Sequence, residues 1–249
     1  MLFRSGTGGP LKWQYGSPRD VVIGMRVAQA DGKVTKSGGQ VVKNVSGYDM
    51  ARLHVGGLGS LGVVCEVSFK LTPKPANEKT VLAAFDNSKS CGDVALSIFN
   101  GQVTPLALNV FDRGVLSATG MSNIEGEQYL AVRLGGRPRG LARMVDETIQ
   151  ASRAGGGTTI EIVDGGSALD LWRRISDFGW VDQPPPEVVL RVSLVPNQVQ
   201  TYIDAIKASL ADNAPSFVAS PGYGNVMVFW QSGNTNNKLE SSGNAIRAL

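Results

Sequence analysis

The stretch from Gly38 to Glu66 has the composition and spacing that most clearly suggest chemistry. It holds two glycine clusters, a Lys43-Asn44 pair shortly before Gly47-Tyr48-Asp49, and the run Gly57-Leu58-Gly59-Ser60-Leu61-Gly62 ahead of β-branched residues. Glycine at this density marks main chain that turns sharply or approaches a ligand closely. For any one of these glycines an ordinary tight turn is the better explanation, so the prediction depends on the whole stretch.

The other residue types limit the chemistry. His54 is the single histidine, so the chain cannot supply a two-histidine metal site, and a Ser-His-Asp triad would need His54 itself. We expect His54 to be a packing or surface residue rather than a catalyst. Cys65 and Cys91 lack the spacing of a metal or redox motif, which favours a reducing compartment. We therefore predict no metal site.

Composition indicates a globular protein of one large or two smaller domains. The chain has 249 residues, of which 42% are hydrophobic and 18% charged, so a sizeable core can form. The formal net charge of +3 is weak, and basic residues do not interleave with aromatic ones, which argues against a nucleic-acid partner. No apolar run approaches membrane-spanning length. We predict a cytoplasmic protein and leave open an association with the inner membrane through a partner subunit.

The first part of the chain reads as turns, strands and one short helix. Glycines and Pro10 predict a loop over residues 6–16, and the β-branched run from Val21 to Ala28 predicts a strand. Asp31-Gly32 predicts a hairpin turn with a return strand from Val34. Residues 49–55 predict a helical turn and residues 63–71 a strand. Prolines 73 and 75 then predict a domain boundary, giving domains over 1–76 and 77–249.

The second part alternates strands and helices. Strands are predicted over residues 80–85, 106–111, 128–134, 158–163, 188–194, 217–219 and 226–230. Helices are predicted over residues 90–99, 138–154, 168–178 and 197–210. Short connections between these elements predict an α+β fold, an α/β sandwich of ferredoxin-like repeats with helices on one face of the sheet.

Both ends read as cut. The chain starts in a turn-rich segment, and residues 233–249 read as a loop followed by the first turns of a helix. We therefore expect the sequence to be a fragment of a longer protein.

The first part resembles the second half of the FAD-binding domain (PCMH type) of the vanillyl-alcohol oxidase flavoprotein family. The resemblance comes from motifs that follow in order over about seventy residues: Tyr15–Gly24, Ala30–Gly32, Gly38–Gly39, Lys43–Asp49 and Gly59–Val64. Within the family the sequence is most similar to the smaller FAD-binding subunit of bacterial glycolate oxidase, the E-type subunit, which shares a segment like Leu171–Ile175. The resemblance is strong up to Pro75 and weaker beyond it. The family's glycine-rich pyrophosphate loop and its C-terminal Asn-Pro-Gly-Arg phrase have no counterpart here.

The resemblance implies an FAD-dependent oxidoreductase that oxidises glycolate or a related 2-hydroxy acid. It implies partners as well, a second FAD-binding subunit and an iron–sulfur subunit. Alternatives are another FAD-linked 2-hydroxy-acid dehydrogenase, such as a D-lactate-type enzyme, or a structural subunit without catalysis. The FAD-contacting candidates are Gly6, Gly8, Gly9, Gly16, Ser17, Asp20, Asn44, Tyr48, Gly62, Val63 and Val64.

Several of these candidates keep a structural alternative. Main-chain N–H groups of the first glycines could bind the anionic pyrophosphate, or the glycines could form a plain turn. Asp20 and Asp49 could equally cap helices, and Asp20 could pair with Arg19. For the second domain, an arginine that binds the substrate carboxylate is expected. Arg133 and Arg191, on predicted strands, are the candidates.

Overall fold

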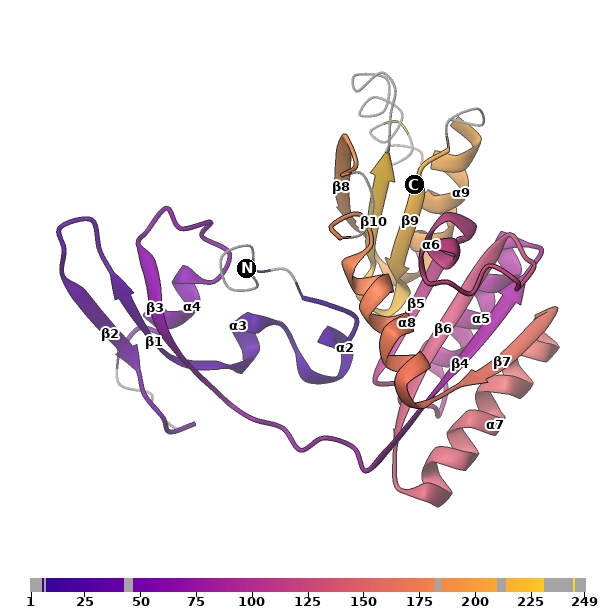
Figure 1. Ribbon diagram of the computed structural model, residues 1–249, viewed down its shortest axis with the longest axis horizontal. Coiled ribbons are helices and arrows are strands. Elements are labelled where there is room, and N and C mark those ends of the chain that lie inside the picture. The colour runs from indigo at the N-terminus through magenta and orange to yellow at the C-terminus, as the bar shows by residue number, and fades with distance from the viewer. Residues whose placement is uncertain are drawn as a thin grey trace. The chain divides into compact units, whose positions relative to one another are not determined.

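The computed structural model describes residues 6, 8–42, 47–181, 185–209, 214–230 and 244. Its contacts divide the chain into two compact units, Met1–Lys74 and Pro75–Leu249. Each unit has its own sheet and its own core (Figure 1).

The described residues of the first unit form a sheet of three strands in the order β2-β1-β3. Strand β1 covers Val22–Ala28, β2 covers Val34–Gly38 and β3 covers Val63–Phe69. β1 pairs antiparallel with both neighbours. In the hairpin between β1 and β2, the Lys33 amide donates to Asp31 and Gly32 has a φ of 82°. The predicted strands and hairpin are confirmed.

Short helices complete the first unit: α2 Lys12–Tyr15, α3 Pro18–Val21 and α4 Met50–His54. The core is small, made of Val22, Met25, Val27 and Ala51, with Val55, Val64 and Val67 packed against it. The prediction of a plain loop over residues 6–16 was wrong, since α2 lies within it. The loop signal came from the flanking glycines, and Gly16 ends the helix with a φ of 81°.

The described residues of the second unit form one sheet of seven strands, in the order β7-β4-β6-β5-β9-β10-β8, with every pair antiparallel. Its elements, in chain order, are β4 Asn77–Phe85, α5 Ser88–Asn100, β5 Ala107–Asp112, α6 Arg113–Ala118, β6 Gln128–Gly136, α7 Pro138–Ala154, β7 Thr159–Val163, α8 Gly165–Asp177, β8 Val188–Ser193, the 3₁₀ turn η1 Pro196–Gln198, α9 Val199–Ser209, β9 Ser216–Ser220, the 3₁₀ turn η3 Pro221–Tyr223 and β10 Asn225–Trp230.

This order contains a repeat. The elements β4-α5-β5-β6-α7-β7, with strand order 7-4-6-5, form a ferredoxin-like β-α-β-β-α-β unit. The elements β8-α9-β9-β10 place their strands as the first three strands of that unit are placed. The predicted α+β fold is confirmed. We call residues 75–163 the first repeat and residues 188–230 the second repeat.

Helices cover both faces of this sheet, and the prediction of helices on one face was wrong. Helices α5, α7 and α9 pack on one face, in a core that includes Val81, Ala83 and Phe85 of β4. Helix α8 packs on the other, where the Trp172 Nε1–H donates to Thr80 Oγ1 at 2.8 Å. β4 is apolar on both faces, so a single layer of helices would leave half of it exposed. Helix α6, which was not predicted, contacts β5 and β9.

Candidate functional site

The glycine turn of the first unit, residues 56–62, joins the end of α4 to β3. Gly62 has a φ of 134°, and a Cβ there would come within 2.6 Å of the Ala28 carbonyl oxygen, so no other residue fits without displacing β1. Gly59 has a φ of 84° with open space around it. Leu58 also has a positive φ, 53°, which is uncommon for a residue with a side chain. The glycines of the turn therefore allow backbone dihedral angles and a close approach to β1 that residues with side chains would not.

A hollow of about 610 Å³ lies against this turn and strand β3. It is lined by residues of α4, the turn and β3: His54, Gly57, Leu58, Gly59, Leu61, Gly62, Val63, Val64, Cys65, Glu66 and Val67. Val63 is 69% exposed, whereas Val64 is partly buried and packs on the core of the unit. Three candidates, Gly62, Val63 and Val64, thus share one concave surface.

The glycines near the start of the chain meet this turn at one point. A Cβ on Gly6 would lie 3.2 Å from the Gly56 Cα, so the two main chains approach closely. Gly8 and Gly9 are exposed, and the Gly9 carbonyl accepts from the Lys12 amide at the start of α2. The structure therefore places Gly6 at the glycine turn, while Gly8 and Gly9 lead into the first helix.

Gly16, Ser17 and Asp20 form a local cap. Asp20 Oδ2 accepts from the Ser17 amide at 2.7 Å and from the Ser17 hydroxyl at 2.6 Å. These hydrogen bonds lower the pKa of the Asp20 carboxyl. A Cβ on Gly16 would lie 2.8 Å from the Asp20 side chain. The alternative in which Asp20 caps a helix therefore matches its contacts, and none of the three lines the hollow.

The remaining candidates of the first unit are not gathered at the hollow. Asn44 lies outside the described residues. Tyr48 is 93% exposed and does not line the hollow. Asp49 caps α4, accepting from the Arg52 amide at 3.3 Å and pairing with the Arg52 guanidinium at 3.0 Å.

The two arginine candidates of the second unit have different surroundings. Arg133, on β6, donates from Nε to Glu78 Oε2 at 2.8 Å, and the two side chains are only 13% and 21% exposed. Arg191, on β8, is exposed and donates from Nε to Asn225 Oδ1 at 3.0 Å. Arg133 therefore already forms an ion pair with a largely buried carboxylate, whereas the Arg191 guanidinium lies at the surface of the unit.

Sequence reasoning did not include several side chains of the hollow among the candidates, and two of them, His54 and Cys65, are chemically reactive types. His54 is partly buried at the end of α4, and Cys65 is exposed on β3. Their position within the glycine-rich stretch was the available signal. Across the described ranges, no group of three histidine, cysteine or acidic side chains is arranged to hold a metal ion. Within the same ranges, no helix has both the length and the apolar character needed to cross a bilayer.

Comparisons with curated proteins find relatives among flavin-linked oxidases. No family model matches the chain. It is 39% identical over 110 residues to glycolate oxidase subunit GlcD of Bacillus subtilis, covering 44% of this chain and 23% of that protein. It is 36% identical over 104 residues to glycolate oxidase subunit GlcE of Escherichia coli, covering 42% and 29%. An uncharacterized FAD-linked oxidoreductase of Mycobacterium tuberculosis is 28% identical over 240 residues, covering 88% and 51%. The chain thus spans about half the length, or less, of these relatives.

Among solved structures, p-cresol methylhydroxylase with substrate bound matches with a TM-score of 0.65 at 12% identity, covering 99% of this chain and 57% of that one. This likeness shows that the chain shares its fold with p-cresol methylhydroxylase. The predicted resemblance is confirmed: the chain is homologous to glycolate oxidase subunits and to an FAD-linked oxidoreductase.

Proposed function

We propose that this chain is part of an FAD-dependent oxidoreductase that oxidises a 2-hydroxy acid to the 2-oxo acid. The first unit supplies one wall of the flavin site, and residues 77–249 form the cap and substrate domain. The observation that carries the proposal is the hollow at the glycine turn. The match to an FAD-linked oxidoreductase covers 88% of this chain, which is long enough to include the residues that build the hollow.

The residues of the hollow fit such a group. Flavin dinucleotides combine a flat ring system with an anionic pyrophosphate. The ring needs an apolar surface to pack against, and the pyrophosphate needs main-chain N–H groups that approach it closely. Leu61 and Val63 are exposed apolar side chains at the hollow, whereas Gly59 and Gly62 leave the main chain uncovered at their own positions. The carboxylate of Glu66, which also lines the hollow, pairs with Arg26 at 3.6 Å, so its charge is partly balanced.

When bound, FAD supplies the two-electron acceptor for the CH–OH oxidation. The chain's own contribution to substrate binding is a cation for the carboxylate. We assign this role to Arg191, whose exposed guanidinium can reach an anion, and a structural role to Arg133, which Glu78 already engages.

The finer role is that of an E-type subunit in a glycolate oxidase-like complex, with a second FAD-binding subunit and an iron–sulfur subunit as partners. Similarity to both a GlcD and a GlcE subunit supports membership of a multi-subunit enzyme. Attachment at the inner membrane through those partners belongs to the same proposal. Two alternatives remain, a D-lactate-type dehydrogenase and a structural subunit without catalysis. A survey of 2-hydroxy-acid substrates tests the first, and the FAD-binding experiment below tests the second.

Two glycines provide a matched test of FAD binding. Gly59 and Gly32 have nearly the same φ, 84° and 82°, and a Cβ added at either would have no atom within 4 Å, so Ala should strain both turns equally. Only Gly59 lines the hollow. We expect Gly59→Ala to raise the Kd for FAD about tenfold, which corresponds to about 1.4 kcal/mol, and Gly32→Ala to leave it unchanged.

Flavin fluorescence measures the affinity, and alkylation of the exposed Cys65, which lines the hollow, reports on the place of binding. Bound FAD should protect Cys65 from a maleimide. If FAD binds without protecting Cys65, or if both glycine variants weaken binding alike, the hollow is not the flavin site. If a protein that includes this chain at the full length of its relatives folds but takes up no FAD, the structural-subunit alternative is favoured.

A further inference from the structure

The two repeats of the second unit are joined in the sheet by a short ladder. Strands β5 and β9 share two register pairs, Val110 with Ala219 and Phe111 with Val218. By comparison, β4 and β6 within the first repeat share nine, and β8 and β10 within the second share six. We call the β5–β9 junction the seam. Main-chain pairing is therefore weakest where the two repeats meet.

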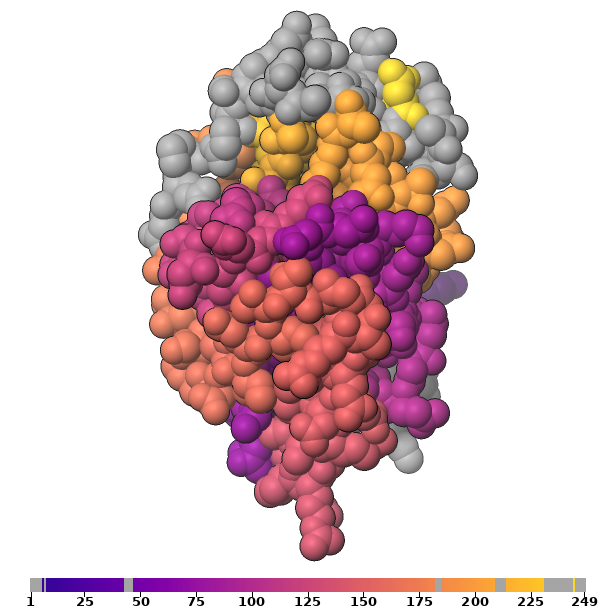
Figure 2. Space-filling model, turned by 90° about the vertical axis from the view of Figure 1, so that its right-hand side faces the viewer, coloured from indigo at the N-terminus to yellow at the C-terminus, as the bar shows by residue number. Residues whose placement is uncertain are grey.

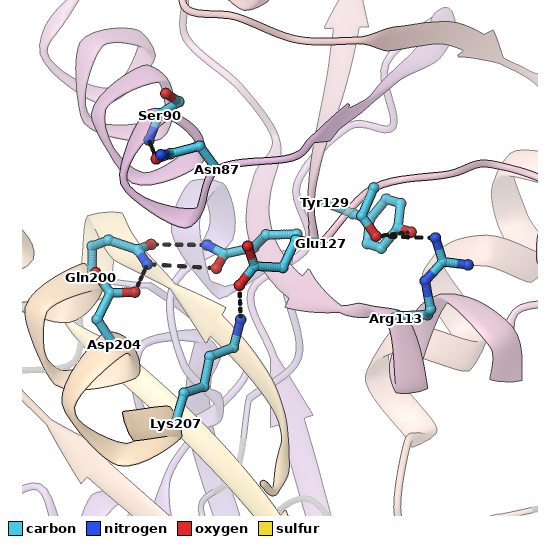
Figure 3. A network of polar contacts seen from close by, with 10 residues as sticks. Asn87, Ser90, Arg113, Glu127, Tyr129, Gln200, Asp204 and Lys207 are labelled. Atoms are coloured by element: carbon cyan, nitrogen blue, oxygen red, sulfur yellow. Dashed lines mark hydrogen bonds and ion pairs between the residues drawn. The ribbon is translucent and has the colours of Figure 1, made fainter. Parts of the chain in front are cut away.

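Side chains cross the seam on the face covered by α5 and α9. Gln128, at the start of β6, is fully buried, and its amide donates to Gln200 Oε1 of α9 at 2.8 Å. The Gln200 amide donates in turn to Asp204 Oδ1 at 2.8 Å (Figure 3). A Cβ on Gly92 of α5 would lie 2.6 Å from Gln200 Cγ, so α5 and α9 are in close contact there. Figure 2 shows this border, with α9 in orange next to the magenta and purple surface of the first repeat.

A second bridge lies beside the first. Lys207 of α9 pairs with Glu127 at 3.3 Å and lies 5.5 Å from the centre of the Phe217 ring on β9 (Figure 3). Its side chain is 22% exposed, so solvent screens the pair only in part. Lys207 therefore connects the start of β6 in the first repeat to two elements of the second.

Two further polar residues of β5 reach across the seam. Asn109, 2% exposed on the opposite face of the sheet, donates to the Ala219 carbonyl at 3.1 Å and to the Ser220 hydroxyl at 3.0 Å. Asp112 accepts hydrogen bonds from Ser216 and from the Phe217 amide. The polar side chains of the seam thus have partners in the other repeat, and they lose those partners together when the repeats separate.

We propose that the polar side chains that cross the seam hold the two repeats together, and we call these residues the latch: Asn109, Asp112, Glu127, Gln128, Gln200 and Lys207. When the second unit opens, the second repeat separates from the first at the seam before either repeat unfolds. A buried polar network is costly when half satisfied, so opening is all-or-none rather than gradual. The short β5–β9 ladder leaves the latch residues as the main directional contacts that hold the two repeats in register. Cooperative sub-global opening of this kind is a general property of folded domains.

Cys91 is a native reporter for this opening. It lies on α5, is fully buried, and bonds with Gln128 of the latch. Burial raises the pKa of the Cys91 thiol, so it is unreactive while the seam is closed. Cys65 is exposed in the first unit and serves as an internal reference for reagent activity. The rate at which a thiol reagent modifies Cys91 then measures the population of the open seam.

The test compares Gln200→Leu with Arg143→Met in the full chain. Gln200→Leu removes the Gln200 acceptor of the buried Gln128 amide, and we expect Cys91 labelling to become at least tenfold faster. Arg143→Met removes an ion pair with Glu147 that lies within α7 of the first repeat, and we expect less than a twofold change. Lys207→Met, a milder change at the second bridge, should speed labelling about two- to fivefold. Cys65 should label equally in all proteins.

Two results overturn the proposal. One is wild-type Cys91 labelling at the rate of global unfolding measured with urea, because the seam then does not open ahead of the fold. The other is equal acceleration by Gln200→Leu and Arg143→Met. If Gln200→Leu fails to fold, Lys207→Met with hydrogen exchange decides: the amides of α9, β9, β10 and β8 must exchange faster together, while those of β4, β6 and α7 do not.

Discussion

The ion pair between Glu78 and Arg133 gives a prediction that separates a structural arginine from a substrate-binding one. The two side chains lie on neighbouring strands β4 and β6, on the sheet face opposite to α5, α7 and α9. Each is mostly removed from solvent, at 21% and 13% exposure. Replacing either residue by Met leaves the other charge without its counter-ion in a site with little water.

Breaking a fully buried ion pair by removing one partner costs about 3–5 kcal/mol. The remaining exposure allows some hydration of the orphaned charge, so we expect about 2–3 kcal/mol for Glu78→Met and for Arg133→Met. At about 2–4 °C per kcal/mol for a protein of this size, each single variant should melt about 4–12 °C lower. The double variant replaces both charges by apolar groups, and we expect it to lie within about 1 kcal/mol of the parent protein.

Thermal and urea unfolding of the four proteins form a double-mutant cycle, and the expected coupling is about 2 kcal/mol or more. Costs that simply add in the double variant would show that the pair contributes no specific interaction. If both singles stay within about 0.5 kcal/mol of the parent while Arg133→Met abolishes binding of 2-hydroxy acids, Arg133 is a substrate ligand and our structural assignment is wrong.

Two further predictions concern buried polar groups of the second unit. Burial raises the pKa of the Asp112 carboxyl above its ordinary value of about 4, so the folded state holds this proton more tightly than the unfolded state. The contribution of the Asp112 proton to folding stability is complete below the unfolded-state pKa and is lost as pH rises through the folded-state pKa. Urea titrations from about pH 4 to about pH 7 should therefore show Asp112→Asn gaining stability relative to the parent. An Asn variant whose relative stability stays flat over that range would contradict this sign. Thr80→Val leaves the Trp172 indole N–H without its acceptor and should cost about 1–3 kcal/mol, whereas Thr80→Ser should cost less than about 1 kcal/mol; equal costs in urea unfolding would refute a role for the hydroxyl.

Most elements of the fold could be predicted because their local signals agree with their packing. Helix α7 begins at a proline and is followed by glycine, and its bounds, Pro138–Ala154, match the prediction. Helix α6 was missed because its six residues are too few for a periodic pattern, and Asp112, which caps it, reads equally as a strand end. The second helical layer was missed for a different reason. The apolar stripe of α8 predicts that the helix packs on something, but not which face of the sheet it covers.

The candidate site was predictable in part. The family resemblance pointed to Gly62, Val63 and Val64, and the structure brings all three to the hollow, where Gly62 lies too close to β1 for a side chain. Their contact with a flavin stays a prediction. Gly16, Ser17 and Asp20 belong to the same set of family motifs, yet in the structure Gly16 ends α2, and Ser17 and Asp20 cap α3. A motif reports that residues recur together, and it does not separate those that face a ligand from those that hold the loop in shape.

For the buried polar residues of this chain, hydrogen-bond partners distinguish a structural role from a ligand-binding role more reliably than residue type does. Arg133, Gln128 and Asn109 would each attract attention as polar residues on core strands, but each is engaged by a partner on another strand or helix. At the hollow, by contrast, the constrained feature is the main chain of residues 56–62, and most of the side chains that line it are apolar or absent. Recognition that depends on main chain should tolerate changes such as Leu61→Met and respond strongly to Ala at Gly59 or Gly62. The polar residues of the second unit should show the reverse pattern, with large effects on stability and small effects on cofactor affinity.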